Sequence, residues 1–125
     1  MIIGIGIDII EIDRIKQSID RFGERFINKV FTQLEAQYCM GKANKYQHFA
    51  ARFAAKEAVV KALADSGDSG FNWKDIEIYN EQGGKPQVNL YGKPRVYLGE
   101  DKELKITMSH SHNYVTCFAI VFEKI

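Results

Sequence analysis

The sequence is poor in residues that cross-link or divide a chain: its 125 residues include two cysteines, two prolines and one tryptophan. Cys39 and Cys117 are too few for a disulfide framework and have no metal-ligand spacing. We expect both thiols to be reduced and mostly buried in a cytoplasmic protein. Because no Pro/Ser-rich linker interrupts the chain, we expect one domain over residues 1–125.

Net charge and long apolar runs are also lacking. The formal charge is +1, from 17 basic and 16 acidic residues, whereas proteins that coat nucleic acid are strongly basic. No apolar run reaches the roughly 18–20 residues of a membrane span, and the N-terminus has no basic region of the kind that begins a secretory signal. With 46% hydrophobic and 26% charged residues, we expect a globular protein that binds neither nucleic acid nor membrane.

Helical patterns precede most of the strand patterns. Thr32 and Glu35 have the spacing of a capping box. The order of elements predicts an α+β fold, with helices packed on a mainly antiparallel sheet. The expected helices are 11–29 with a break at Gly23, 32–41 and 46–65, and the expected strands are 2–10, 76–79, 87–91, 104–109 and 114–122, with loops or turns at 66–70 and 83–86.

The first strand carries a carboxylate on a face with little side-chain bulk. Gly4, Gly6 and Asp8 alternate with isoleucines, so these three residues share one face. Either another segment, subunit or ligand approaches closely there, or a helix packs over the glycines and Asp8 caps the following helix. A dinucleotide-binding fingerprint is excluded, because Ile9 stands where the third glycine belongs and the glycines lie inside the strand.

The central helix is apolar on nearly every side but contains Lys56, Glu57 and Lys61. Glu57 and Lys61 are four residues apart, which suits either a simple ion pair or a charged site. Lys56 falls on an apolar face, where it either extends to solvent or has a polar partner. Carboxylates at Asp8 and Glu57, without thiolates or imidazoles, form a ligand set that suits Mg²⁺ with phosphates, and Lys61 would neutralise phosphate oxygens.

Two later segments have the polarity of turns or of phosphate-binding sites. Residues 109–112, Ser-His-Ser-His, end a strand, where their hydroxyls and imidazoles form either a hairpin turn or contacts to phosphate and adenine. Alternation places His110 on the opposite face from Ser109 and Ser111. In the segment 83–86, Gly-Gly-Lys-Pro, Gly84 either forms a hairpin turn or allows a ligand to approach the backbone.

The first helix has a basic face. Arg14, Arg21 and Arg25 are separated by seven and four residues and share one face of a continuous helix. This face is either solvated or a docking surface for an acidic partner, with Ile19, Phe22 or Phe26 as apolar anchors.

Taken together, these segments resemble the holo-acyl-carrier-protein synthases, across nearly the whole chain and in order. The helix with Lys-Glu-Ala-x-x-Lys and the N-terminal Gly-x-Asp are the specific parts. The matching segments are Gly4-Ile-Gly-Ile-Asp8-Ile9 with Arg14-Ile15, Phe31-Thr32 with Glu35 and Tyr38-Cys39, Arg52-Phe-Ala-Ala-Lys56-Glu57-Ala58 with Lys61-Ala62, Gly84-Lys85-Pro86 and Ser109-His110-Ser111.

The resemblance implies transfer of 4′-phosphopantetheine from coenzyme A to a serine of an acidic apo-acyl carrier protein, with release of 3′,5′-ADP. It also implies a Mg²⁺-dependent homotrimer with active sites between subunits. By position, Asp8 and Glu57 would bind Mg²⁺, and Lys61 would contact phosphate and protonate the leaving group. The implied coenzyme A contacts are Lys56, Lys61, Gly84, Pro86, Ser109, His110 and Ser111, and the implied carrier-protein contacts are Arg14, Arg21 and Arg25.

Several alternatives stay open at this point. The general base is Glu57, Glu35 or a metal-bound water, of which we favour the water. A different small Mg²⁺-dependent phosphoryl or nucleotide hydrolase would use the same carboxylates without a protein acceptor. A nucleotide-binding or acidic-protein-binding module would bind without turnover.

Overall fold

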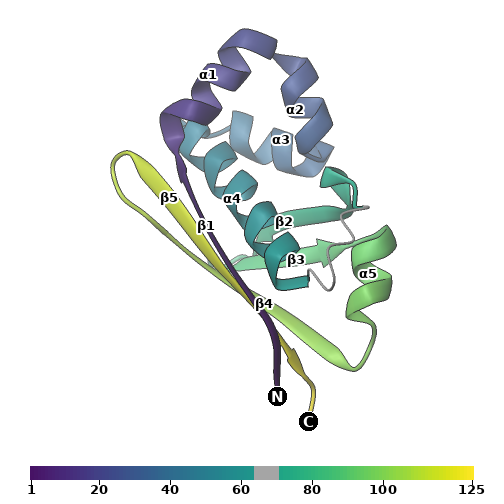
Figure 1. The fold of residues 1–125 in the computed structure, drawn as a ribbon. Coiled ribbons are helices and arrows are strands. Elements are labelled where there is room, and N and C mark those ends of the chain that lie inside the picture. The colour runs from purple at the N-terminus through teal and green to yellow at the C-terminus, as the bar shows by residue number, and fades with distance from the viewer. Residues whose placement is uncertain (64–70) are drawn as a thin grey trace.

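The computed structural model describes residues 1–63 and 71–125. Five helices, one short 3₁₀ helix and five strands make up this part of the chain (Figure 1). The expected loop at 66–70 and the expected helical residues 64–65 lie outside the described residues. In chain order the elements are β1 (Ile2–Glu11), α1 (Ile12–Phe22), α2 (Glu24–Val30), α3 (Gln33–Met40), α4 (Lys45–Leu63), η1 (Trp73–Asp75), β2 (Ile76–Asn80), β3 (Pro86–Leu90), α5 (Gly92–Leu98), β4 (Lys102–His110) and β5 (Tyr114–Glu123).

The strands form two antiparallel sheets. One has the order β1-β5-β4, and the other is the β2-β3 hairpin. Helix α4 packs against β1 and β5 and also contacts β2, so it lies between the two sheets (Figure 1). The α+β class with antiparallel strands is therefore confirmed, and α4 is its central element. No helix in the described part of the chain is long and apolar enough to cross a membrane.

Contact between β1 and α4 is unusually close, because both sides lack bulk. A Cβ atom built at Gly4 would lie 2.0 Å from the Ala62 carbonyl oxygen, and one at Gly6 would lie 2.1 Å from the Ala58 carbonyl oxygen. The glycine face is thus covered by a helix of the same chain. The segment that approaches this face is α4, so helix packing over small residues is correct. The close approach at the glycines comes from the same chain and not from another subunit or a ligand.

The opposite face of β1 is apolar and exposed. Ile5, Ile7 and Ile9 keep 60%, 62% and 66% of their surface exposed. Ile5 pairs with Ile120 of β5, and Ile7 pairs with Phe118, so half-buried apolar side chains continue this face. No described helix packs over it (Figure 1). A continuous apolar face of this kind marks an interaction surface.

The helix boundaries follow local rules. Gly23, at φ 58°, separates α1 from α2, so the expected break is confirmed. Thr32 caps α3, and Glu35 completes the capping box, as its spacing predicted. Helix α5 was not expected: its seven residues are too few to show a helical period, although Pro94 suits a first helical turn.

Both cysteines are free and fully buried. Burial raises the pKa of each thiol to about 12. The expectation of buried thiols is confirmed.

A methyl group at Gly6 should damage the β1–α4 contact. We expect Gly6→Ala to lower the free energy of unfolding by about 1–3 kcal/mol, because the new Cβ must displace the backbone of α4. Gly83→Ala is the matched control, since no described atom lies within 4 Å of a Cβ built there. Urea unfolding of both variants measures the difference, and equal stability of the two would contradict the role assigned to Gly6.

Candidate active site

Strand β1 and helix α4 bring Asp8 and Lys61 together. The Lys61 ammonium donates to the Ile7 carbonyl oxygen at 2.9 Å and to Asp8 Oδ1 at 3.2 Å. The close packing over Gly4 and Gly6 makes this contact possible, because it holds the last turns of α4 against the strand. Asp8 is not the cap of α1, whose N-cap residue is Glu11, so that alternative for Asp8 is wrong.

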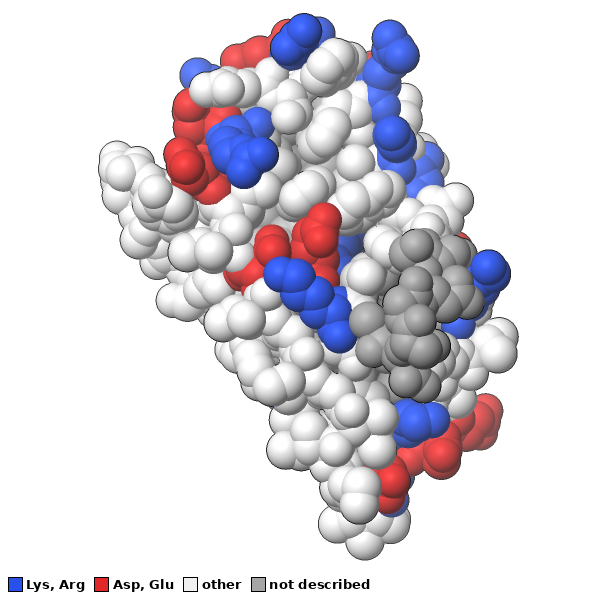
Figure 2. Space-filling view, in the orientation of Figure 1, with Lys and Arg blue, Asp and Glu red and all other residues white. Residues whose placement is uncertain are grey.

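Glu57 belongs to the same group. Burial first, and then the negative charge of Asp8, raise the pKa of the Glu57 carboxyl, while Lys61 opposes them. The two carboxylates are therefore close enough to repel one another. Among the described residues no ion pair joins Glu57 to Lys61; the lysine pairs with Asp8 instead. Figure 2 shows acidic and basic atoms side by side near the centre of the face that is turned toward the viewer.

The donor set of this group fits a hard cation. Mg²⁺ commonly takes one or two protein carboxylates and completes its shell with water and substrate phosphates. Asp8 and Glu57 offer that number of carboxylates. No group of three or more His, Cys, Asp or Glu side chains that could hold a metal ion occurs in the described ranges, so the two carboxylates would need water and phosphate oxygens to complete a shell.

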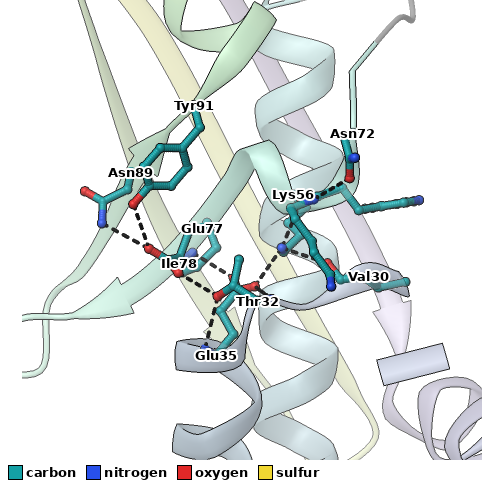
Figure 3. Close-up of polar contacts among 11 residues, drawn as sticks. Val30, Thr32, Glu35, Lys56, Asn72, Glu77, Ile78, Asn89 and Tyr91 are labelled. Carbon is teal, nitrogen blue, oxygen red and sulfur yellow. Dashed lines mark hydrogen bonds and ion pairs between the residues drawn. The ribbon is translucent and has the colours of Figure 1, made fainter. Parts of the chain in front are cut away.

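Lys56 lies in the core rather than at the surface. It is 0% exposed, and its ammonium donates to Glu35 Oε1 at 2.7 Å, the Val30 carbonyl at 2.9 Å and the Trp73 carbonyl at 3.0 Å (Figure 3). Burial lowers its pKa, which the charge of Glu35 opposes. All three ammonium hydrogens are therefore used within this chain. Of the alternatives open for Lys56, a polar partner is correct and extension to solvent is wrong.

Glu35 is equally enclosed. Its Oε1 also accepts from the Thr32 backbone N–H at 2.9 Å, and its Oε2 accepts from the Ile78 backbone N–H at 2.8 Å (Figure 3). The carboxylate links α3 to β2 and to α4. Because it is 0% exposed, Glu35 cannot reach a substrate proton without rearrangement, and it drops out as a candidate general base.

Glu77 extends this polar cluster toward β3. Its carboxylate accepts from the Thr32 hydroxyl at 2.6 Å, from Asn89 Nδ2 at 3.2 Å and from the Tyr91 hydroxyl at 3.1 Å (Figure 3). These hydrogen bonds, together with the charge of Lys56, hold the Glu77 pKa below its usual value even though burial acts to raise it. The cluster therefore ties α3, α4 and the β2-β3 hairpin together.

Arg52 is a residue whose importance sequence reasoning missed. It is 2% exposed, its Nη2 donates to Asn80 Oδ1 at 2.7 Å, and its guanidinium lies 4.3 Å from the centre of the Tyr38 ring. Asn80 in turn donates to the Gly84 carbonyl at 3.0 Å. The signal in the sequence was a charged residue four positions before Lys56 in an otherwise apolar helix.

The Gly-Gly-Lys-Pro segment is a hairpin turn between β2 and β3. The Gly84 N–H donates to the Glu81 carbonyl at 2.7 Å, and Gly84 has φ 91°. That backbone conformation favours glycine. Asn80 links Arg52 to Gly84 by hydrogen bonds, and it pairs with Pro86 across the hairpin.

The Ser-His-Ser-His segment forms the β4–β5 hairpin. The Ser111 N–H donates to the Tyr114 carbonyl at 2.8 Å. Ser109 pairs with Thr116 on the sheet face that carries Ile9, whereas His110 points to the opposite face, as alternation predicted. Near the start of α4, burial first, and then the charges of Arg52, Lys42 and His110, lower the pKa of His48.

We divide the expected site residues, together with Arg52, into two groups. The carboxylate group is Asp8, Glu57 and Lys61, beside β1. The hairpin group is Arg52, Gly84 and His110, with the residues next to them in the two turns. Among the described residues, no hydrogen bond or ion pair joins one group to the other.

The basic residues of the first two helices are exposed, but they do not share one helix. Arg14 and Arg21 lie on α1, and Arg25 follows the break at Gly23 on α2. Of the expected apolar anchors, Phe22 is 49% exposed, while Ile19 and Phe26 are half-buried and pack against the core.

The sequence and fold match one known superfamily. The family model described as 4′-phosphopantetheinyl transferase superfamily matches residues 4–119. The chain belongs to this superfamily. The holo-[acyl-carrier-protein] synthase of Protochlamydia amoebophila is 47% identical over 120 residues, which cover 96% of this chain and 98% of that protein. That of Koribacter versatilis is 43% identical and covers 97% and 98%.

Solved structures agree with these relatives. The holo-[acyl-carrier-protein] synthase of Neisseria meningitidis has a TM-score of 0.86 at 29% identity, over 98% of this chain and 100% of that one. The Helicobacter pylori enzyme, in complex with coenzyme A, has a TM-score of 0.81 at 28% identity, over 94% and 99%. The expected family, fold class and enzyme class, a phosphopantetheinyl transferase, are confirmed.

Removing the Lys56 ammonium should leave a buried carboxylate without its partner. We expect Lys56→Met to lower the free energy of unfolding by about 3–5 kcal/mol, and the double variant with Glu35→Gln to lose less, because its buried side chain is neutral. Lys74→Met, at an exposed lysine, should change stability by no more than about 0.5 kcal/mol. Urea unfolding tests the series, and an unchanged Lys56→Met variant would refute the assignment.

Proposed function

We propose that this enzyme transfers the 4′-phosphopantetheine group of coenzyme A to a serine hydroxyl of an apo-acyl carrier protein, releases 3′,5′-ADP and requires Mg²⁺. The observation that carries the proposal is the Asp8–Lys61 contact beside Glu57 in a member of this superfamily. The names of the relatives and the coenzyme A complex of one of them support the donor and the acceptor.

Each side chain of the carboxylate group has a role in this reaction. Asp8 and Glu57 would hold Mg²⁺, which neutralises charge on the coenzyme A diphosphate when it is bound. Lys61 would contact a phosphate oxygen and donate a proton to the leaving 3′,5′-ADP. Phosphoryl transfer depends on positioning and charge neutralisation more than on a covalent nucleophile. With Glu35 buried, Glu57 and water are the remaining candidates for the base.

The hairpin group would bind the nucleotide half of coenzyme A. Gly84, Pro86, Ser109, His110 and Ser111 were expected to make these contacts, and they lie in or beside the β2–β3 turn and the β4–β5 hairpin. For Lys56 we propose a supporting role, because its ammonium is used inside the core. Arg52 supports this half of the site by connecting α4 to the Gly84 turn.

We further propose that the active enzyme is a homotrimer with its sites between subunits. The isoleucine face of β1 is exposed along its length, and a second copy of the chain would cover it. Arg52 of the hairpin group and Lys61 of the carboxylate group are nine residues apart and so point to opposite sides of α4. Among the described residues no hydrogen bond or ion pair joins the two groups, and we propose that two subunits would each supply one group to a site. The contact runs through the isoleucine face, not through the glycine face that α4 covers.

The acidic carrier protein would dock on the exposed arginines of the first two helices. Arg14, Arg21 and Arg25 would pair with its carboxylates, and Phe22 offers an exposed apolar contact. We also propose that the enzyme works in the cytoplasm, to which the two free cysteines are suited.

The transfer reaction can be tested directly by intact-mass spectrometry of an apo-acyl carrier protein incubated with the enzyme, coenzyme A and Mg²⁺. We expect a gain of about 340 Da, the mass of the phosphopantetheine arm, that EDTA abolishes. Asp8→Asn should slow the transfer at least about a hundredfold, because it removes a charged ligand. Asp101→Asn, an exposed aspartate, is the matched control.

Two results would contradict the proposal. Release of ADP without any gain of mass on the carrier would indicate a hydrolase. Binding of coenzyme A without turnover, with several apo carriers, would indicate a binding module.

Assembly through the isoleucine face makes a separate prediction. Ile5→Glu should weaken self-association at least about tenfold, because each interface would bury an unpaired carboxylate. Val96→Glu is the control, since Val96 is 81% exposed on α5. Light scattering after size-exclusion chromatography measures the mass of each variant, and an Ile5→Glu protein as large as the parent would argue against this interface.

A further inference from the structure

The Lys61 ammonium binds the same carboxylate that is proposed to hold Mg²⁺. It donates to Asp8 Oδ1 at 3.2 Å while also donating to the Ile7 carbonyl at 2.9 Å. The two acceptors belong to consecutive residues of β1. The lysine therefore has one charged partner and one neutral partner, about equally near.

We propose that Lys61 and the divalent cation compete for Asp8, so that cation binding moves the ammonium off the carboxylate and onto the substrate phosphate. This inference rests on the proposed function of the carboxylate group. The Ile7 carbonyl keeps the ammonium beside the site after Asp8 is taken. Binding of the cation thereby makes the phosphate-binding lysine available.

The exposure of the two side chains favours such an exchange. The Asp8 side chain is 18% exposed, whereas that of Lys61 is 52% exposed. A half-exposed ion pair is weak and is readily broken, and the long lysine side chain can turn without moving α4. Asp8 is fixed by its strand, since its backbone carbonyl accepts from the Thr116 hydroxyl at 2.7 Å. The lysine is thus the movable partner.

Charge gives the exchange a direction. A divalent cation attracts the two carboxylates of Asp8 and Glu57 more strongly than one ammonium does, because Coulomb attraction scales with charge. The same cation repels the ammonium. The displaced ammonium retains two free hydrogens for a phosphate oxygen, since only one remains on the Ile7 carbonyl.

The competition is tested by binding of Mn²⁺ as a probe, followed by electron paramagnetic resonance on the full chain without coenzyme A. Lys61→Met keeps the length of the side chain and removes its charge, and it should bind Mn²⁺ roughly three- to tenfold more tightly. Lys61→Arg should bind as the parent does. Lys74→Met, at an exposed lysine of η1, lowers the net charge equally and should leave the affinity unchanged.

The movement itself is tested by NMR of ¹⁵N-labelled lysine ammonium groups. We expect the Lys61 signal to shift on addition of Mg²⁺, and the signal of exposed Lys74 to stay in place. An unshifted Lys61 signal at saturating Mg²⁺, or unchanged Mn²⁺ affinity in Lys61→Met, would overturn the competition; the cation would then use the other Asp8 oxygen.

Asp8→Asn separates this inference from the proposed function. It should weaken Mn²⁺ binding at least about tenfold if Asp8 is a ligand. Unchanged Mn²⁺ affinity in Asp8→Asn would overturn the metal site itself. Weak binding in Asp8→Asn with no gain in Lys61→Met would overturn the competition alone.

Discussion

The close approach of α4 to β1 is the constraint on which the site depends. Side chains larger than hydrogen at Gly4 and Gly6 would push the helix away from the strand, and the short Asp8 side chain would then lie farther from the groups on α4. Gly4 and Gly6 leave no room for a Cβ, and Ala58 and Ala62 face them with their backbone carbonyls. Packing and chemistry are therefore coupled, because the residues that remove bulk lie directly before the carboxylate.

The contacts of buried Lys56 fix the rotation of α4 about its axis, and this rotation sets where the other charged side chains of the helix point. The Lys56 side chain is held in one orientation, because its ammonium donates three hydrogen bonds, to α2, α3 and η1. Glu57 is the next residue, about 100° around the helix. A buried ion pair contributes little net stability compared with apolar packing, but it specifies one arrangement. Here that arrangement also fixes the rotation of α4 and with it the direction of Glu57, whose carboxyl pKa is raised by burial and by the charge of Asp8.

How much of the structure the sequence predicts depends on how far apart along the chain the interacting residues are. Capping at Thr32 and Glu35, the break at Gly23 and the alternation of β1 are local, and each was predictable. The partner of Lys56 was not, because Glu35 lies on another helix and nothing in the spacing links them. The pairing of Lys61 with Asp8 instead of Glu57 was hidden for the same reason. Residue chemistry alone reached a Mg²⁺ and phosphate site; the transferase reaction required the family resemblance.

The alternation of β1 has a consequence beyond the single chain. Glycines and Asp8 face α4, so every isoleucine of the alternating run must face the other way, where no described element of this chain covers it. A strand that presents its small residues inward to build a site must leave its large residues outward. Exposed isoleucines are costly in water, and a second copy of the chain would remove that cost. The pattern of residues that places the carboxylate against α4 therefore also leaves an apolar face that favours the proposed assembly. Assembly through this face would bring a second subunit next to the strand that carries Asp8.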